Sequence, residues 1–211
     1  MIHESPPPLS GSLPRFQRPP CGLFVDRWGT LLELPAKGYV TRFEDVRFQP
    51  GALEALFRAH RAGWQLYLIG NEDQVAFGRQ SDASWEKLKS DLLEHLDQQG
   101  IGLRRFYAAV DRPDGKGAHQ GDSVFLLPNT GAFYQAHHLD GLELERSWVI
   151  GDGTLELVAG WRAGLRQAGV RTGLALGDAT YEVDPEIVAA DLASAVQAVM
   201  NAEGVIHSRA G

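Results

Sequence analysis

Hydrophobic positions along the chain fall into two alternating patterns, short continuous apolar runs and longer segments with apolar residues every three or four positions. The apolar runs predict strands at about 22–26, 64–70, 105–110, 147–152 and 170–176. The periodic segments predict helices at about 50–63, 82–99, 130–138, 154–163 and 185–200. Strands that alternate with helices of this length are typical of βαβ units around a parallel sheet. The sequence therefore predicts one α/β domain over residues 21–205.

Three segments do not fit this alternation. Residues 1–20 hold most of the prolines, which lack backbone N–H donors, and we expect a flexible proline-rich N-terminal arm. Such an arm is either an unstructured leader or a segment that binds a partner. Residues 31–49 are too long for a simple βα turn and predict a small flap, and residues 206–211 predict a short tail.

Composition and charge narrow the classes of function. The formal charge of −7 argues against non-specific binding to nucleic acid or to acidic membranes, which needs a basic face. No apolar run approaches the roughly 20 residues that cross a bilayer, and the N-terminus lacks the pattern of a secretory signal. Because Cys21 is the single cysteine, neither an intrachain disulfide nor a cysteine-rich zinc site is expected. These features predict a cytoplasmic protein.

Candidate chemistry lies where two predicted strands end. Asp26 and Asp152 each follow a buried apolar run, and each precedes a glycine and a threonine. The carboxyl ends of parallel strands share one edge of a sheet, where open α/β folds bind their ligands. Two neighbouring carboxylates repel each other unless a cation lies between them, which favours a hard divalent ion. The alternative is that each aspartate caps the segment after its strand.

Several motifs in order carry a family resemblance. The run Asp26-Arg27-Trp28-Gly29-Thr30 resembles motif I, D-x-D-G-T, of the haloacid dehalogenase (HAD) superfamily. Gly38-Tyr39-Val40, Pro50-Gly51-Ala52, Ala62-Gly63-Trp64 and the run from Ser147 to Asp152 are similar to the branch that contains heptose-bisphosphate and histidinol-phosphate phosphatases. The similarity extends from about residue 21 to residue 178. It implies a HAD-like Rossmannoid three-layer α/β sandwich with a parallel central sheet and a minimal cap.

The resemblance also implies roles for individual residues. Asp26 stands at the position of the nucleophile that attacks phosphorus. Asp26, Asp152 and the backbone carbonyl of Trp28 stand at the positions that hold Mg²⁺. Gly70 and Asn71 stand in the motif that binds the phosphoryl group of a small phosphorylated metabolite.

At four positions the chain departs from the family pattern. Trp28 replaces the aspartate that serves as general acid and base, and Gly70 replaces the phosphate-binding threonine. Leu127 replaces the lysine that neutralises the phosphoryl group, and Glu156 replaces the later aspartate of motif IV. The zinc loop of many relatives is also absent, with His119 alone remaining there, so no zinc is expected.

These departures lead to two hypotheses of function. Losing general acid–base catalysis costs roughly 10²–10⁴ in rate, and losing preorganised charge costs about another 10²–10³. The first hypothesis is a catalytically degenerate HAD-like phosphatase homologue that binds or assembles with a protein partner. The alternative is an active Mg²⁺-dependent hydrolase that acts through Asp26 on a small phosphorylated sugar or related metabolite. In that case Glu72, Asp73 or the substrate supplies the acid and base.

The sequence leaves alternative roles open for two residues close to Asp26, Arg27 and Trp28. An arginine beside a strand end is usually a surface residue, and we expect this of Arg27, although it could supply positive charge to the site. Trp28 either fills the vacated phosphate pocket or stacks on a planar ligand.

Overall fold

The structure is a computed structural model, and it describes residues 19–209 with the exception of residue 37. Most of the predicted N-terminal arm lies outside the described residues. Six strands form one parallel sheet in the order β3-β2-β1-β4-β5-β6. The strands are β1 (Gly22–Asp26), β2 (Gln65–Ile69), β3 (Leu103–Phe106), β4 (Trp148–Gly151), β5 (Arg166–Val170) and β6 (Ile187–Ala189). The central position of β1 places its last residue, Asp26, at the middle of the carboxyl edge.

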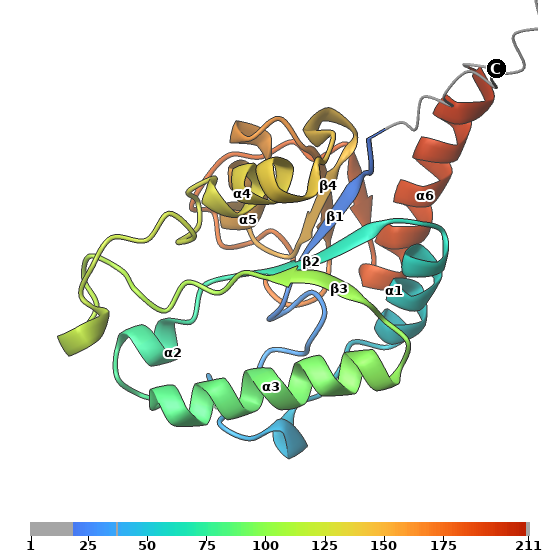
Figure 1. Cartoon of the computed structure of the whole chain (residues 1–211). Coiled ribbons are helices and arrows are strands. Elements are labelled where there is room, and N and C mark those ends of the chain that lie inside the picture. The colour runs from blue at the N-terminus through green and yellow to red at the C-terminus, as the bar shows by residue number, and fades with distance from the viewer. Residues whose placement is uncertain (1–18, 37, 210–211) are drawn as a thin grey trace, which may run out of the picture.

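Helices cover both faces of this sheet, as Figure 1 shows. Buried residues of α1 (Ala52–Arg61), α3 (Asp82–Gln98) and α6 (Leu192–Arg209) form one hydrophobic core with one face. Buried residues of α4 (Gly131–Asp140) and α5 (Thr154–Arg162) form a second core with the other face. The short helix α2 (Asp73–Ala76) follows β2. These layers confirm the predicted HAD-like three-layer α/β fold. No helix in the described part of the chain is long and apolar enough to span a membrane.

Most elements occur where the hydrophobic pattern predicts them, and the long helix begins after Ser81, whose side chain accepts a hydrogen bond from the Ser84 amide. The prediction for 170–176 is wrong, because the strand is β5 at 166–170. The following segment turns, with positive φ at Gly173, Ala175 and Leu176. The prediction of one helix over 185–200 is also wrong at its start, where β6 pairs with β5 before α6 begins.

The segment 31–49 packs against α3 instead of forming a separate domain. Leu32 forms an isolated antiparallel bridge with Phe48. The rings of Phe43 and Phe48 both lie against His95 of α3, with centroids 5.3 and 5.1 Å away. Val46 is buried in the same core. The segment thus forms a small flap close to the carboxyl edge, consistent with a minimal cap. At the other end of the chain, α6 continues through Arg209, past the boundary of 206 predicted for the tail.

Candidate active site at the carboxyl edge of the sheet

Three carboxylates converge where β1 and β4 end. Asp26, Asp152 and Glu156 each offer an oxygen atom, and these atoms all lie within 4.8 Å of one another. Asp26 is the last residue of β1, Asp152 directly follows β4, and Glu156 lies in the first turn of α5. β1 and β4 are hydrogen-bonded neighbours, which explains why their ends meet. The expected proximity of Asp26 and Asp152 is confirmed, and Glu156 joins them.

The carboxylate of Asp152 is held by hydrogen bonds and has glycines packed closely around it. Thr30 Oγ1 donates a hydrogen bond to Oδ1 at 3.1 Å, and the amide of Leu174 donates one to Oδ2 at 2.7 Å. A Cβ built on Gly29 or on Gly173 would overlap this carboxylate, and both glycines have positive φ. These positions therefore require glycine, both for space and for backbone conformation.

Glu156 is held just as closely. Its Oε1 accepts a hydrogen bond of 2.6 Å from the amide of Gly153, and a Cβ on Gly151 would overlap its side chain. The glutamate is only 6% exposed. The longer side chain in place of the family's aspartate is thus accommodated by glycine in β4 and still reaches the cluster.

The pKa values of the cluster show how crowded these charges are. Burial, followed by repulsion from Asp152, raises the pKa of Glu156 to about 7. Burial, with repulsion from Glu156 and Asp152, raises the pKa of Asp26 well above its usual range, and the nearby Arg27 opposes this shift. Burial also raises the pKa of Asp152. Each carboxylate would ionise more readily with a cation among them.

The donor set fits a hard divalent cation. Three carboxylate oxygens that are close together, partly buried and raised in pKa match the oxygen ligands that Mg²⁺ prefers. Asp26, Asp152 and Glu156 would hold the ion directly or through water. The backbone carbonyl of Trp28 as a further ligand stays a prediction.

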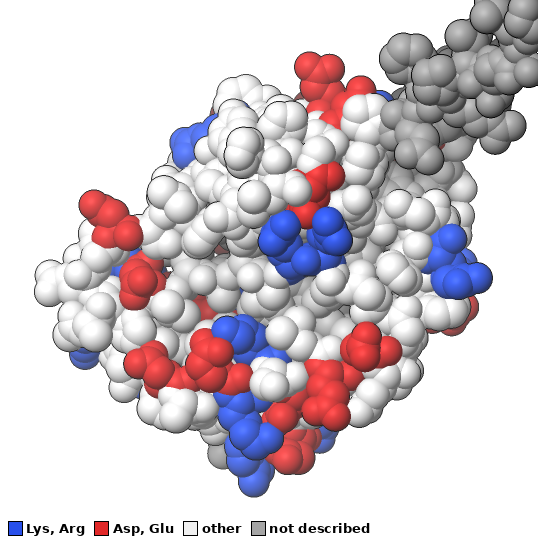
Figure 2. All heavy atoms as spheres, in the orientation of Figure 1, with Lys and Arg blue, Asp and Glu red and all other residues white. Residues whose placement is uncertain are grey.

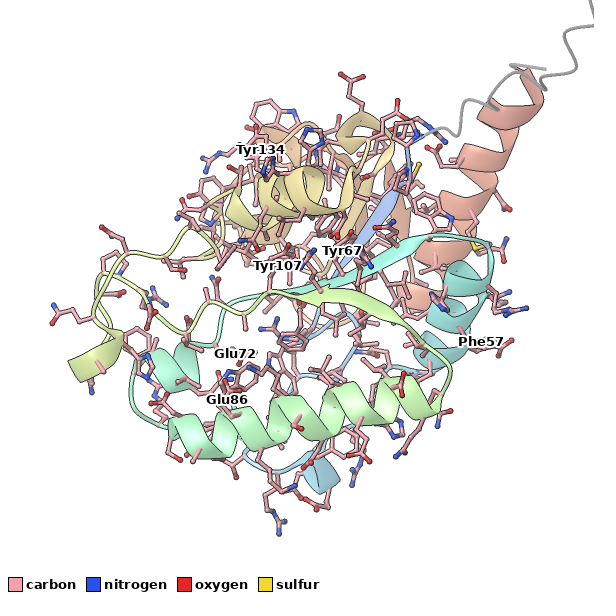
Figure 3. All side chains as sticks on the ribbon, in the orientation of Figure 1. Phe57, Tyr67, Glu72, Glu86, Tyr107 and Tyr134 are labelled. Atoms are coloured by element: carbon pink, nitrogen blue, oxygen red, sulfur yellow. The ribbon has the colours of Figure 1, made fainter. Side chains whose placement is uncertain are left out.

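Arg27 does not lie at the surface, which corrects the expectation from its place beside a strand end. Its side chain is 1% exposed and forms an ion pair with Glu72, which is 0% exposed. Arg27 Nε donates to Glu72 Oε1 at 3.0 Å, and Nη1 donates to the carbonyl of Tyr107 at 2.9 Å. The guanidinium also lies 4.8 Å from the ring centroid of Phe106. Figure 3 shows Glu72 between the sheet and α3.

This pair also determines the surroundings of Trp28. Glu72 accepts side-chain hydrogen bonds from Arg27 and Gln74. Burial raises the pKa of Glu72, and the charge and hydrogen bonds of Arg27 oppose this shift. The indole of Trp28 packs against the core formed with α3. Of the two interpretations of Trp28, this arrangement agrees with packing.

Gly70, Asn71 and Leu127 lie at the next strand end, and the structure gives each a local role. A Cβ on Gly70 would lie 2.9 Å from Asp26 Oδ1 and 3.1 Å from Arg27 Nη2. The amide group of Asn71 holds the backbone of Leu127, accepting from its N–H at 2.8 Å and donating to its carbonyl at 3.3 Å. The Leu127 side chain is buried in the core with α4 and α5. Substrate contacts from Gly70 and Asn71 stay predictions.

Arg112 and His119, in the loop after β3, pair with carboxylates of α2, of α3 and of the loop itself. Asp73 pairs with Arg112 at 2.6 Å, and His119 bridges Asp111 and Asp82 at 2.8 Å each. These side-chain hydrogen bonds raise the pKa of His119. Figure 2 shows acidic and basic groups interspersed on the face in view, with no broad basic area on that face.

Comparison with known proteins gives the family. A family model described as HAD-hydrolase-like matches residues 127–195. A D-glycero-beta-D-manno-heptose-1,7-bisphosphate 7-phosphatase of Haemophilus ducreyi is 31% identical over 156 residues, which are 73% of this chain and 85% of the relative. The D-glycero-D-manno-heptose-1,7-bisphosphate 7-phosphatase of Thermosynechococcus vestitus is 32% identical over 186 residues, 83% of this chain and 93% of the relative.

Solved structures show the same fold. The D,D-heptose 1,7-bisphosphate phosphatase of B. bronchiseptica, complexed with magnesium and phosphate, aligns with a TM-score of 0.74 at 22% identity. The alignment covers 86% of this chain and 99% of that one. The order of the motifs, the topology of the sheet and the extent of both sequence matches all indicate the same family. The chain therefore belongs to the HAD-like hydrolases, in the family of the D-glycero-D-manno-heptose-1,7-bisphosphate 7-phosphatases.

Proposed function

We propose that the protein is a Mg²⁺-dependent phosphohydrolase that acts through Asp26 on a small phosphorylated sugar or a related metabolite. The observation that carries this proposal is the cluster of Asp26, Asp152 and Glu156, whose oxygen atoms lie within 4.8 Å of one another. The names of the two sequence relatives, both heptose-bisphosphate phosphatases, support the class of substrate. When bound, the cation would offset the repulsion between three carboxylates and a phosphate dianion.

The residues of this chain divide the work as follows. Asp26, at the end of a rigid central strand, presents a carboxylate oxygen as the nucleophile. Thr30 and the backbone amide of Leu174 orient Asp152. Arg27 contributes positive charge next to Asp26 while it remains bound to Glu72. The proposal assigns no proton transfer to Trp28, because an indole N–H is only a donor of hydrogen bonds.

A second candidate, a binding or assembly protein with little turnover, is favoured by three changes around the intact fold. Trp28, Gly70 and Leu127 together remove the general acid, a hydroxyl and a positive charge. The side chain of Leu127 is buried in the core, so no other polar group takes the place of the family's lysine at that position. The proline-rich residues 1–20, mostly outside the described residues, are the segment for which we predict a partner-binding role in this case.

One comparison separates the two candidates. Purified protein is assayed with Mg²⁺ against a panel of phosphorylated sugars and acyl phosphates, beside Asp26→Asn and the control Asp114→Asn, which changes an exposed carboxylate outside the cluster. Turnover that is lost in Asp26→Asn and kept in Asp114→Asn supports the hydrolase. Absence of turnover, with a partner that is retained by the full chain and lost when residues 1–20 are removed, supports the binding protein.

A further inference from the structure

The position two residues after Asp26 has no group that can transfer a proton. The indole of Trp28 neither gains nor loses a proton at usable pH. Glu72 cannot take over this task, because it is 0% exposed and bound by Arg27 and Gln74. Asp73 is paired with Arg112. Within the described residues, the acids that remain beside Asp26 are Asp152 and Glu156, which belong to the metal set.

We infer that Asp26 is phosphorylated by small acyl phosphates and that the resulting phosphoaspartate persists. This inference rests on the proposed function, because it needs Asp26 as the nucleophile. According to this inference, the stability of the leaving group decides which phosphorylated compounds react, and the sugar moiety does not.

The first step shows why an acyl phosphate suits this site. An oxygen of Asp26 forms a bond to phosphorus, and the bond from phosphorus to the leaving oxygen breaks. The leaving group departs with the electron pair, as a carboxylate from an acyl phosphate or as an alkoxide from a sugar ester. A carboxylate is stable without a proton, because carboxylic acids have pKa values of about 4. An alkoxide, comparable to hydroxide from water with its pKa of about 15.7, requires a proton that residue 28 cannot give.

The second step, hydrolysis of the phosphoaspartate, also lacks a proton-transferring group at residue 28. This holds for every compound that donates the phosphoryl group. Water attacks phosphorus, the bond to the Asp26 oxygen breaks, and Asp26 leaves as a carboxylate that needs no proton. The attacking water must lose a proton, and without a base it passes to bulk water or to the phosphate product. Loss of general acid–base catalysis slows such a step by about 10²–10⁴-fold. The covalent intermediate should therefore accumulate, with a burst of product followed by a slow steady rate.

Gly70 lies directly beside the carboxylate of Asp26. A side chain at residue 70 would have its Cβ only 2.9 Å from the Asp26 carboxylate. Glycine therefore keeps a side chain from crowding the Asp26 carboxylate on this side. The buried Arg27 on the same side places a positive charge beside it.

The experiment combines kinetics with the mass of the protein. The full chain with Mg²⁺ is mixed with acetyl phosphate, p-nitrophenyl phosphate or glycerol 3-phosphate, and intact mass is followed over time. We expect one added phosphoryl group with acetyl phosphate, released by hydroxylamine and located on Asp26 by peptide mapping of the unaltered protein. Asp26→Asn should lose the label, and Asp114→Asn, which changes an exposed carboxylate outside the cluster, should keep it. Acetyl phosphate should exceed glycerol 3-phosphate in kcat/KM by at least about 10²-fold.

The outcomes separate this inference from the proposed function. Turnover that depends on Asp26 but is equally fast on glycerol 3-phosphate and acetyl phosphate, without a labelled protein, overturns the inference alone. A label located on another residue also overturns it. If neither turnover nor label appears with any donor, the proposed function fails and the inference fails with it.

Discussion

The buried ion pair of Arg27 and Glu72 should contribute more to the stability of this fold than any exposed pair. Both side chains are almost completely excluded from water, at 1% and 0% exposed. Replacing Arg27 by methionine leaves the charge of Glu72 buried with Gln74 as its side-chain donor, and the carbonyl of Tyr107 loses the hydrogen bond from Arg27 as well. Breaking a buried pair from one side costs about 3–5 kcal/mol. Glu72→Met should cost a similar amount, because it leaves a buried guanidinium without a counter-charge.

The double variant Arg27→Met/Glu72→Met distinguishes this explanation from a simple loss of packing. Removing both charges also removes the desolvation cost, so the double variant should be far more stable than the sum of the single effects predicts. We expect a coupling of about 3 kcal/mol, the upper end for residues in contact. Equilibrium unfolding in urea measures all four proteins, with the midpoint shifting at constant slope.

An exposed pair in the same chain is the control. Arg42 and Asp45 also form an arginine–carboxylate pair, but their side chains are 67% and 50% exposed. Arg42→Met should change the free energy of unfolding by less than about 1 kcal/mol. Single effects at Arg27 and Glu72 as small as this, or a double variant that equals their sum, would refute the assignment of a coupled buried pair.

Three further predictions concern the carboxylate cluster and the loop after β3. Because the pKa of Glu156 is raised to about 7 from 4.5, the stability of the protein should fall as pH rises between these values. Thermal unfolding with EDTA measures this dependence, which should be weaker in Glu156→Gln. The pKa of His119 is also raised in the folded protein, so the stabilisation by protonated His119 is complete below pH 6.5 and is lost as pH rises through the pKa of the folded state. Hydrogen exchange of residues 111–122 should show this loss, and His119→Asn should abolish the pH dependence. Gly29→Ala should prevent Mg²⁺ binding by displacing Asp152, as measured by calorimetry, whereas Gly63→Ala, with the same φ of 93° and open space around it, should bind normally.

The part of the site that follows from strand ends was predictable from the sequence. Asp26 and Asp152 each terminate an apolar run, and parallel strands bring such ends together whatever surrounds them. The sequence shows Glu156 only as a replacement for the family's later aspartate in motif IV. Its position beside Asp26, in the first turn of α5, comes from the structure.

The buried pair beside the site was not predictable in this way. Arg27 and Glu72 are 45 residues apart, and their contact depends on the pairing of β1 with β2, which brings the segments after these strands together. Local pattern treats an arginine after a strand as solvent-exposed, because most arginines are. The misplaced fifth strand has a related cause. Residues 171–177 are apolar enough for a strand, but their backbone turns so that Leu176 and Leu174 donate amide hydrogen bonds to Asp152.

The position of Trp28 close to Glu72 shows that the altered positions are not independent. Trp28 lies in the first motif and Glu72 in the second, yet Trp28, Arg27 and Glu72 line one small cavity. Trp28→Asp alone would place a second acid beside Glu72, and Glu72→Gln alone would leave Arg27 without its counter-charge. These changes therefore have to be made and tested together.

Simple restoration of the family residues is blocked at the other two altered positions. Threonine at Gly70 would bring its Cβ to within 3.1 Å of Arg27 Nη2, at a φ of 145° that side chains rarely adopt. Lysine at Leu127 would be buried at a position that is 5% exposed. Burying an unpaired ammonium group is costly, so the lysine would lose its charge or the loop would move. Introducing the family residues at positions 70 and 127 would therefore require further changes around each position, near Arg27 for threonine at 70 and in the second core for lysine at 127.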